Sequence, residues 1–125
     1  MRGDKFHNSI VDQAGKIFIS HGWDVYKEYR YPCNAVTTYL DIFAMRCNYK
    51  IGCEVETTSR HILDNATKSA VANIPLWVIV PSRKLQHLAW RMIESSDVTG
   101  VSMTKVLLPY QLEQELINFE KKGIS

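Results

Sequence analysis

The spacing of the apolar residues changes at Gly22, and this change predicts a helix followed by strands. Before Gly22, apolar side chains recur every three or four residues, as on one face of a helix over residues 6–21. These side chains are Phe6, Ile10, Ala14, Ile17 and Phe18. Gly22 is the expected stop, because glycine readily adopts the left-handed conformation that ends helices. Residues 23–31 then alternate and are rich in aromatic side chains, which is typical of a strand.

Two more alternating segments follow the first predicted strand at short intervals. They cover residues 36–46 and 50–57. The tripeptide Pro32-Cys33-Asn34 and the residue Asn48 are expected to turn the chain between strands, because these residue types favour turns. Short connections of this kind join antiparallel neighbours, so the three strands predict a meander.

The spacing of the apolar residues changes again after the third strand. Ser59 is a candidate N-cap for a helix that ends near Asn73, ahead of Pro75. Residues 76–80 form an uninterrupted apolar run, which is typical of a strand covered on both faces. The third strand, this helix and the buried strand therefore predict a right-handed βαβ crossover.

The last part of the chain continues the alternation of helices and strands. Ser82 is expected to cap another helix, residues 101–108 to form a fifth strand, and Pro109 to open a final helix that ends at Gly123. The order αβββαβαβα predicts an α/β fold with a mixed five-stranded sheet and helices on both faces. The length of 125 residues predicts one domain over residues 1–125.

Composition narrows the class of protein only slightly. A hydrophobic content of 46% and a charged content of 22% are ordinary for a globular domain. No segment reads as a membrane span or a signal peptide, which favours a cytoplasmic protein with no membrane partner. Cys33, Cys47 and Cys53 show no Cys-x-x-Cys spacing. Small buried hydrophobes are therefore the simpler interpretation, with a zinc site as a minor alternative.

Acidic residues on the predicted strands are the strongest chemical signal. Glu28 lies on the first strand, Asp41 on the second, and Glu54 and Glu56 on the third. Because side chains alternate along a strand, Glu54 and Glu56 are expected on the same face. Carboxylates on an apolar strand are costly unless something positive neutralises them. Hard cations such as Mg²⁺ prefer carboxylate oxygens, so the sequence predicts a Mg²⁺ or Mn²⁺ site.

The charge distribution is more informative than the net charge of +2. With these four acids set aside, nine of the 13 acids remain against 15 Lys and Arg, a net +6 for the rest of the chain. An acidic pocket in a mildly basic shell suits a polyanion whose reacting phosphate meets a metal ion.

The strand order and the acids together resemble a known family. Asp41 on the second strand and Glu54-x-Glu56 on the third, inside a helix–meander–helix–strand frame, resemble the PD-(D/E)XK nuclease superfamily. That superfamily includes many restriction endonucleases and the archaeal Holliday junction resolvases, and its members carry Asp and then Glu-x-Lys. The gap of 13 positions between Asp41 and Glu54 lies within the family's range. The resemblance covers roughly residues 6–81, and residues 82–125 look like an extension of the sheet.

The resemblance implies a restriction-endonuclease-like fold and a Mg²⁺- or Mn²⁺-dependent endonuclease that acts on DNA. It implies metal ligation by Asp41, Glu54 and the backbone carbonyl of Val55. Glu28, on the neighbouring strand, could complete the ligand set. The small size leaves little room for a sequence-reading module, so structure-selective cleavage of branched or duplex DNA is expected, with a homodimer as one arrangement. Similar compact nucleases are frequent in viruses and mobile elements, and such an origin is compatible with the chain.

Glu56 is the main departure from the family's pattern, because it stands where the family has Lys. Glu56 could act as the base or as a metal ligand, as some restriction enzymes suggest. Alternatively, Lys68 on the following helix could replace the missing Lys, with Asn65 three positions earlier on the same stripe. Leu40 also replaces the proline that often precedes the family's Asp, which is a common variation.

Further candidate contacts with nucleic acid are basic or polar residues around the acids. They are Lys27, Arg30, Arg60, Asn65 and His7, the last of which resembles a His found there in some relatives. A solvated helix face is the competing interpretation of Asn65 and Lys68, because both lie opposite the apolar stripe of their helix. Tyr39, Trp77 and Trp90 are expected to be core or interface aromatics.

Two other classes of function remain open at this point. The missing Lys favours a catalytically inactive nuclease-fold module that binds nucleic acid or assembles with a partner. An unrelated α/β protein with a metal-sensing or structural role is a third interpretation. The sequence does not distinguish DNA from RNA as the substrate.

Overall fold

A computed structural model of the chain describes residues 4–33, 36–96 and 103–123. Five strands form one mixed sheet in the order β1-β2-β3-β4-β5, with β1, β2 and β3 antiparallel and β3, β4 and β5 parallel. The strands are β1 (Asp24–Cys33), β2 (Val36–Arg46), β3 (Tyr49–Val55), β4 (Leu76–Ile79) and β5 (Thr104–Leu107). The predicted meander and the parallel pair that follows it are therefore confirmed.

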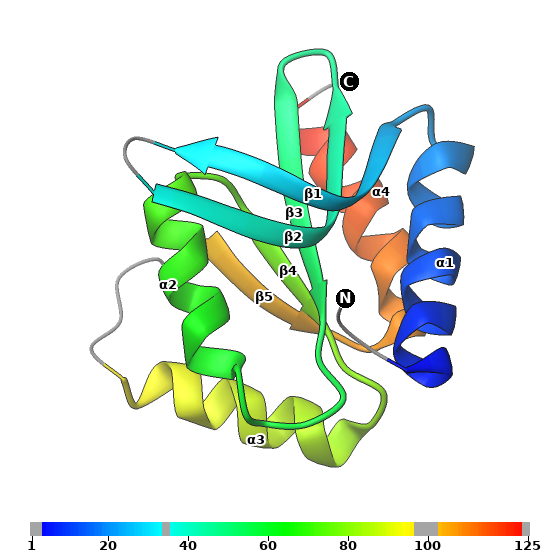
Figure 1. The fold of residues 1–125 in the computed structure, drawn as a ribbon. Coiled ribbons are helices and arrows are strands. Elements are labelled where there is room, and N and C mark those ends of the chain that lie inside the picture. The colour runs from blue at the N-terminus through cyan, green and yellow to red at the C-terminus, as the bar shows by residue number, and fades with distance from the viewer. Residues whose placement is uncertain (1–3, 34–35, 97–102, 124–125) are drawn as a thin grey trace.

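Helices cover both faces of this sheet, as Figure 1 shows. On one face lie α1 (Lys5–Ser20) and α4 (Leu112–Gly123), which share a hydrophobic cluster with β2, β3 and β4. On the other face lie α2 (Ile62–Ala72) and α3 (Arg83–Glu94), which pack on β4 and β5. A short 3₁₀ turn, η2 (Pro109–Gln111), leads into α4. The predicted class, an α/β fold with a mixed five-stranded sheet flanked by helices, is confirmed.

The N-terminal helix forms where the sequence predicts it. The Asp4 side chain accepts a hydrogen bond of 2.9 Å from the His7 N–H and so caps α1. The helix ends before Gly22, whose φ of +86° needs a residue without a side chain. Phe18, fully buried on its inner face, packs against Trp77 of β4 with ring centroids 6.2 Å apart. This packing ties α1 to the centre of the sheet.

Several element boundaries differ from the sequence prediction. The turn predicted at Pro32-Cys33-Asn34 is wrong for its first two residues, which belong to β1, while Asn34 lies outside the described residues. Pro32 is accommodated because β1 is an edge strand, where a missing N–H is tolerated. The Ser59 cap is also wrong, since α2 begins at Ile62 and its first helical bond runs from the Asn65 N–H to the His61 carbonyl.

Later boundaries shift by one to three residues. The strand β3 ends at Val55, and β5 begins at Thr104, with 101–102 outside the described residues. Ser82 caps α3 as predicted, accepting a bond of 3.2 Å from the Leu85 N–H. All four residues of β4 are buried, as a strand covered on both faces requires.

The alternation of side chains along β2 breaks at Asp41. Leu40 and Phe43 pack in one cluster with Leu76 of β4, on the face that α2 covers. Residues three positions apart in a regular strand face opposite ways, so this shared cluster marks an irregularity. Ile42 packs on the α1 face. Figure 1 shows β2 turning sharply in its course across the sheet.

The neighbouring strand β1 carries a matching irregularity at Glu28. Its φ of +50° is left-handed, which costs a residue with a side chain about 1–3 kcal/mol. The β1–β2 register is the same on both sides of it, with Lys27 opposite Ile42 and Tyr29 opposite Leu40. The two strands therefore bend together at the place where the sequence puts two of its four acids.

Among the described residues, none of the helices combines the length and the apolar character needed to cross a lipid bilayer.

Candidate functional site

Three of the four predicted acids are buried. Asp41 exposes 6% of its surface, Glu54 none and Glu56 2%. Acidic side chains are almost never buried to this degree unless they are paired, so their partners decide what the cluster can do. These three acids and the side chains that contact them are called the candidate site below.

Asp41 joins three elements of the fold. Its Oδ2 atom accepts a hydrogen bond of 2.8 Å from the Val55 N–H on β3 and lies 3.2 Å from Nε2 of His7 on α1. His7 is itself buried, and its Nδ1 lies 3.0 Å from the Asn8 side chain. Two contacts on one oxygen fix the orientation of the Asp41 carboxyl group.

Glu54 pairs with a lysine from the crossover helix. Nζ of Lys68 donates to Oε1 of Glu54 at 2.9 Å and to the backbone carbonyl of Tyr39 at 3.0 Å. Burial raises the pKa of Glu54 to about 8, and the charge of Asp41 acts in the same direction, while Lys68 acts to lower it. Burial, which is the largest cause, and the neighbouring acid together therefore outweigh the lysine partner.

Glu56 has a different partner on the same helix. Nδ2 of Asn65, which is 1% exposed, donates to Oε2 of Glu56 at 2.8 Å. The Glu56 N–H binds the carbonyl of Ile79 at the end of β4, which anchors this residue just past β3. Because Asn65 and Lys68 both lie on α2, the two glutamates face the same helix, as alternation predicted. The interpretation of their stripe as a solvated face is wrong.

Glu28 lies at the mouth of the same region. It is exposed, and it lines a cavity of about 290 Å³ together with Asp41 and His7, between the first turns of α1 and the bend in β1 and β2. This cavity is called the acidic cavity below. Lys27, the neighbour of Glu28 along β1, donates to Asp12 on α1.

The predicted nucleic-acid contacts fall into two groups. His7 and Asn65 are buried and bind acids, so they belong to the interior of the candidate site. Lys27, Arg30 and Arg60 are exposed. The structure thus leaves the three long basic side chains where a polyanion can reach them.

Tyr39 is one of the aromatics that the sequence predicted as core or interface residues. Its side chain is 62% exposed, so it is not a core aromatic, and its backbone carbonyl receives Lys68. No sequence signal identifies a backbone carbonyl as a ligand, since every residue carries one. The helical stripe shared by Asn65 and Lys68 was the one signal that could have led from α2 to the acids.

The donor set fits a hard cation, although it is small. The described part of the chain contains no group of three or more His, Cys, Asp or Glu side chains that could hold a metal ion. Mg²⁺ often uses one or two carboxylates and completes its shell with water and phosphate oxygens. Asp41 and Glu54, on adjacent strands, can supply two. However, Lys68 already provides a positive partner for Glu54, so burial alone does not require a cation.

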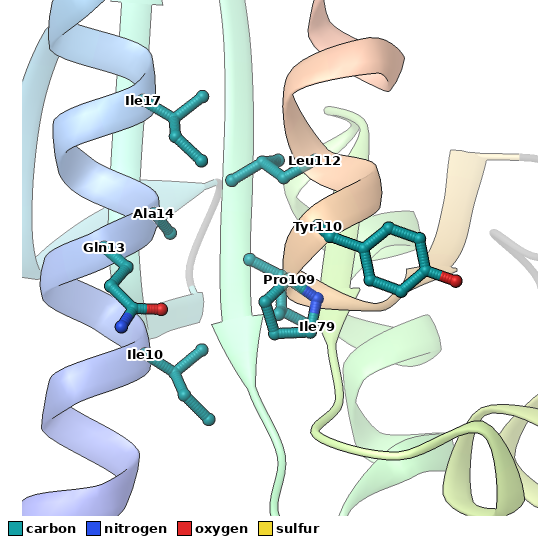
Figure 2. Close-up of a pocket in the computed structure, with 8 residues that line it drawn as sticks. All are labelled: Ile10, Gln13, Ala14, Ile17, Ile79, Pro109, Tyr110 and Leu112. Carbon is teal, nitrogen blue, oxygen red and sulfur yellow. The ribbon is translucent and has the colours of Figure 1, made fainter.

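A second cavity lies elsewhere, between α1 and the start of α4, and Figure 2 shows its lining. Its volume is about 250 Å³, and its walls are Ile10, Gln13, Ala14, Ile17, Ile79, Pro109, Tyr110 and Leu112. This lining contains no acid, lysine, arginine or histidine. Its polar side chains are those of Gln13 and Tyr110, so the charged groups are at the acids and the candidate site remains there.

Comparisons with known proteins support the fold alone. No protein-family model matches the chain, and no curated protein matches its sequence. The structure is similar to the crystal structure of AF1548, a protein of unknown function, with a TM-score of 0.56 and 13% sequence identity. The match covers 90% of this chain and 66% of that one, so this chain spans slightly less than two thirds of its neighbour.

Proposed function

We propose that this protein is a metal-dependent endonuclease that hydrolyses phosphodiester bonds in DNA, built on a restriction-endonuclease-like fold of the PD-(D/E)XK type. The hydrogen bond of 2.9 Å that Lys68 donates to Glu54 carries the proposal. It brings a lysine from the helix after β3 to Glu54, two positions before Glu56, which stands where that superfamily carries its lysine.

The surrounding geometry supports this assignment. Continuing the β2–β3 register one pair beyond Ile42 and Cys53 sets Asp41 opposite Glu54. These two carboxylates and the Val55 carbonyl would hold Mg²⁺ or Mn²⁺. When bound, such an ion neutralises charge on the phosphate and makes a bound water more acidic.

The chain's own residues have distinct roles in this proposal. The Val55 N–H and His7 orient Asp41. Lys68, held by Glu54 and the Tyr39 carbonyl, donates to the attacking water or to the phosphate, and so takes the place of the missing motif lysine. Glu56 has a positioning role: it accepts a hydrogen bond from Asn65 and so holds the inner side of α2 in place.

A second candidate function is a module that binds DNA without cutting it. The observation that favours it is the complete burial of Glu54 with a lysine as its partner. An acid neutralised in this way can serve the fold alone, and Lys68 then has no substrate to contact.

A cleavage assay separates the two functions. Branched, single-stranded and duplex DNA are incubated with the protein in Mg²⁺, in Mn²⁺ and in EDTA, and the products are resolved on denaturing gels. We expect cutting that requires the metal and is lost in Asp41→Asn and Glu54→Gln. The matched control is Glu115→Gln, which removes the acid of an exposed Lys–Glu pair with Lys105 on α4 and β5. DNA binding without any cutting in both metals would support the module.

A further inference from the structure

Tyr39 and Arg30 form an exposed pair beside the candidate site. They are register partners across β1 and β2, and both are exposed. Partners in an antiparallel pair place their side chains on the same face with Cβ atoms about 4.5–5.5 Å apart. An aromatic ring and a guanidinium group therefore lie next to each other in solvent.

This pair lies on the same side of the sheet as the acidic cavity. Tyr29 and Leu40, the neighbours of Arg30 and Tyr39 along the two strands, pack toward the α2 face. Because successive side chains alternate, Arg30 and Tyr39 face the opposite side, onto which the acidic cavity opens near the N-terminus of α1.

Tyr39 differs from the other tyrosines of β1 and β2. The rings of Tyr26, Tyr29 and Tyr31 pack around Phe43, with centroid distances from 4.7 to 6.3 Å. The ring contacts among the described residues do not include Tyr39. Its backbone, in contrast, is tied to the acids, because Lys68 binds its carbonyl and Glu54 together. The ring is thus presented to solvent from a backbone fixed at the candidate site.

We propose that Tyr39 and Arg30 form a stacking platform for an unpaired base of a strand that reaches the candidate site from the side of the acidic cavity. This inference rests on the proposed nuclease function and names its substrate class, which is DNA with unpaired nucleotides at the cut. Exposed aromatic rings stack on any base, and arginine adds stacking and phosphate contacts. Bases inside a continuous duplex are stacked on one another and are not available to such a ring.

The charge around the platform agrees with a nucleic acid as its occupant. Lys27, Arg30 and Arg60 are exposed positive side chains, and Lys27 lines the acidic cavity. The acids themselves repel phosphate. Base stacking does not depend on charge, so it can add to the affinity for DNA despite this repulsion. The two residues are therefore expected to differ in their salt dependence. Arg30→Gln lowers the slope of log affinity against log salt by about one unit, and Tyr39→Leu leaves it unchanged.

Binding is measured in EDTA, so that the result does not depend on cleavage. A labelled short oligonucleotide is titrated as a single strand and as a duplex. Tyr39→Leu is expected to weaken single-strand binding by roughly 5- to 100-fold and to leave duplex binding unchanged. Tyr39→Phe, which keeps the ring, is expected to bind like the wild type. Tyr110→Leu is the matched control, since Tyr110 is 67% exposed and lies on η2, outside the candidate site.

Equal weakening for both DNA forms, or no change for either, overturns the platform. A dimer that becomes a monomer in Tyr39→Leu, with single-strand affinity unchanged, also overturns it, because the face then joins two copies of the chain. If Tyr39→Leu does not fold, quenching of a 2-aminopurine base in the single strand is measured with the wild type and with Tyr39→Phe, both of which keep the ring. Quenching by both proteins supports the platform, and its absence overturns it. A selective loss of single-strand binding with no cutting in Mg²⁺ or Mn²⁺ keeps the platform and rejects the nuclease.

Discussion

Two polar clusters lie at the two ends of α1, and they balance their charges differently. At the N-terminal end is the candidate site, where His7 contacts Asp41. Just past the C-terminal end, His21 contacts Glu113 and Glu120 at 3.0 and 3.1 Å. The second cluster, called the α4 clamp here, also includes Trp23 and Arg46, which donate to Glu120 at 2.9 and 2.7 Å.

The two glutamates at the centres of these clusters have opposite pKa shifts. In the α4 clamp, burial acts to raise the pKa of Glu120, but hydrogen bonds from Trp23, His21 and Arg46 outweigh it and the pKa is lowered. In the candidate site, burial raises the pKa of Glu54, Asp41 adds to it, and Lys68 does not compensate. A cluster with enough donors stabilises the fold. In the candidate site, burial outweighs the contribution of Lys68, so the cluster contains an acid whose charged form is disfavoured.

Removing the lysine of the candidate site is expected to have the largest effect. Under the proposed function, Lys68→Ala lowers the single-turnover cleavage rate by about 10²–10⁴-fold and changes DNA affinity little, because the lysine acts at the reacting phosphate. Lys105→Ala is the control, since it breaks the exposed pair with Glu115. Cleavage by Lys68→Ala at the wild-type rate would mean that the lysine serves only to neutralise Glu54.

The pH dependence of stability tests the raised pKa of Glu54 directly. A carboxyl group whose folded pKa is about 8 instead of 4.5 favours the folded state at low pH, and this contribution is lost as pH rises from about 4.5 to 8. We expect the free energy of unfolding of the wild type, relative to Glu54→Gln, to fall across that window by at most about 1.4 kcal/mol per pH unit. Urea titrations at a series of pH values measure it. A difference that does not change with pH would remove the contrast between the two clusters.

The α4 clamp is expected to affect stability and not cleavage. Glu120→Gln removes the charge that three donors share, so we expect a loss of roughly 1.5–3 kcal/mol in the free energy of unfolding. Since the lowered pKa of Glu120 stabilises the folded state above pH 4.5, the loss should shrink as pH falls below that value. Glu94→Gln, an exposed acid on α3, is the control. A lower cleavage rate per folded molecule would show that the clamp also serves the site.

Glu56→Gln is expected to have the smallest effect of the four changes. Glutamine keeps an oxygen that can accept the hydrogen bond from Asn65, so α2 should stay in place. If Lys68 replaces the motif lysine, the cleavage rate changes little. A drop of about 10²–10⁴-fold would instead identify Glu56 as the general base and reverse the assignment.

Sequence reasoning predicted the elements better than it predicted their irregularities. The period of the apolar residues located α1, the meander and β4, because burial on one or both faces determines that period. It could not predict the left-handed Glu28 or the break at Asp41. Those depend on two strands bending together, which no local pattern along either strand encodes.

The acids of the candidate site were predictable, but their partners were only partly so. Asp41, Glu54 and Glu56 stood out as charges on otherwise apolar strands. Asn65 and Lys68 were visible as a polar stripe, yet a stripe opposite the apolar face usually meets solvent. It meets buried acids here because α2 packs beside the end of β3, a tertiary arrangement that periodicity does not report.

The two outer strands of the sheet bear on how the protein avoids aggregation. Open strand edges invite the edges of other chains, and proline and lysine are residues that interrupt such pairing. Pro32 lies on the outer strand β1, and the exposed Lys105 lies on the outer strand β5, which is only four residues long. Pro32 and Lys105 therefore interrupt both outer edges of the folded sheet and oppose its growth by strand addition.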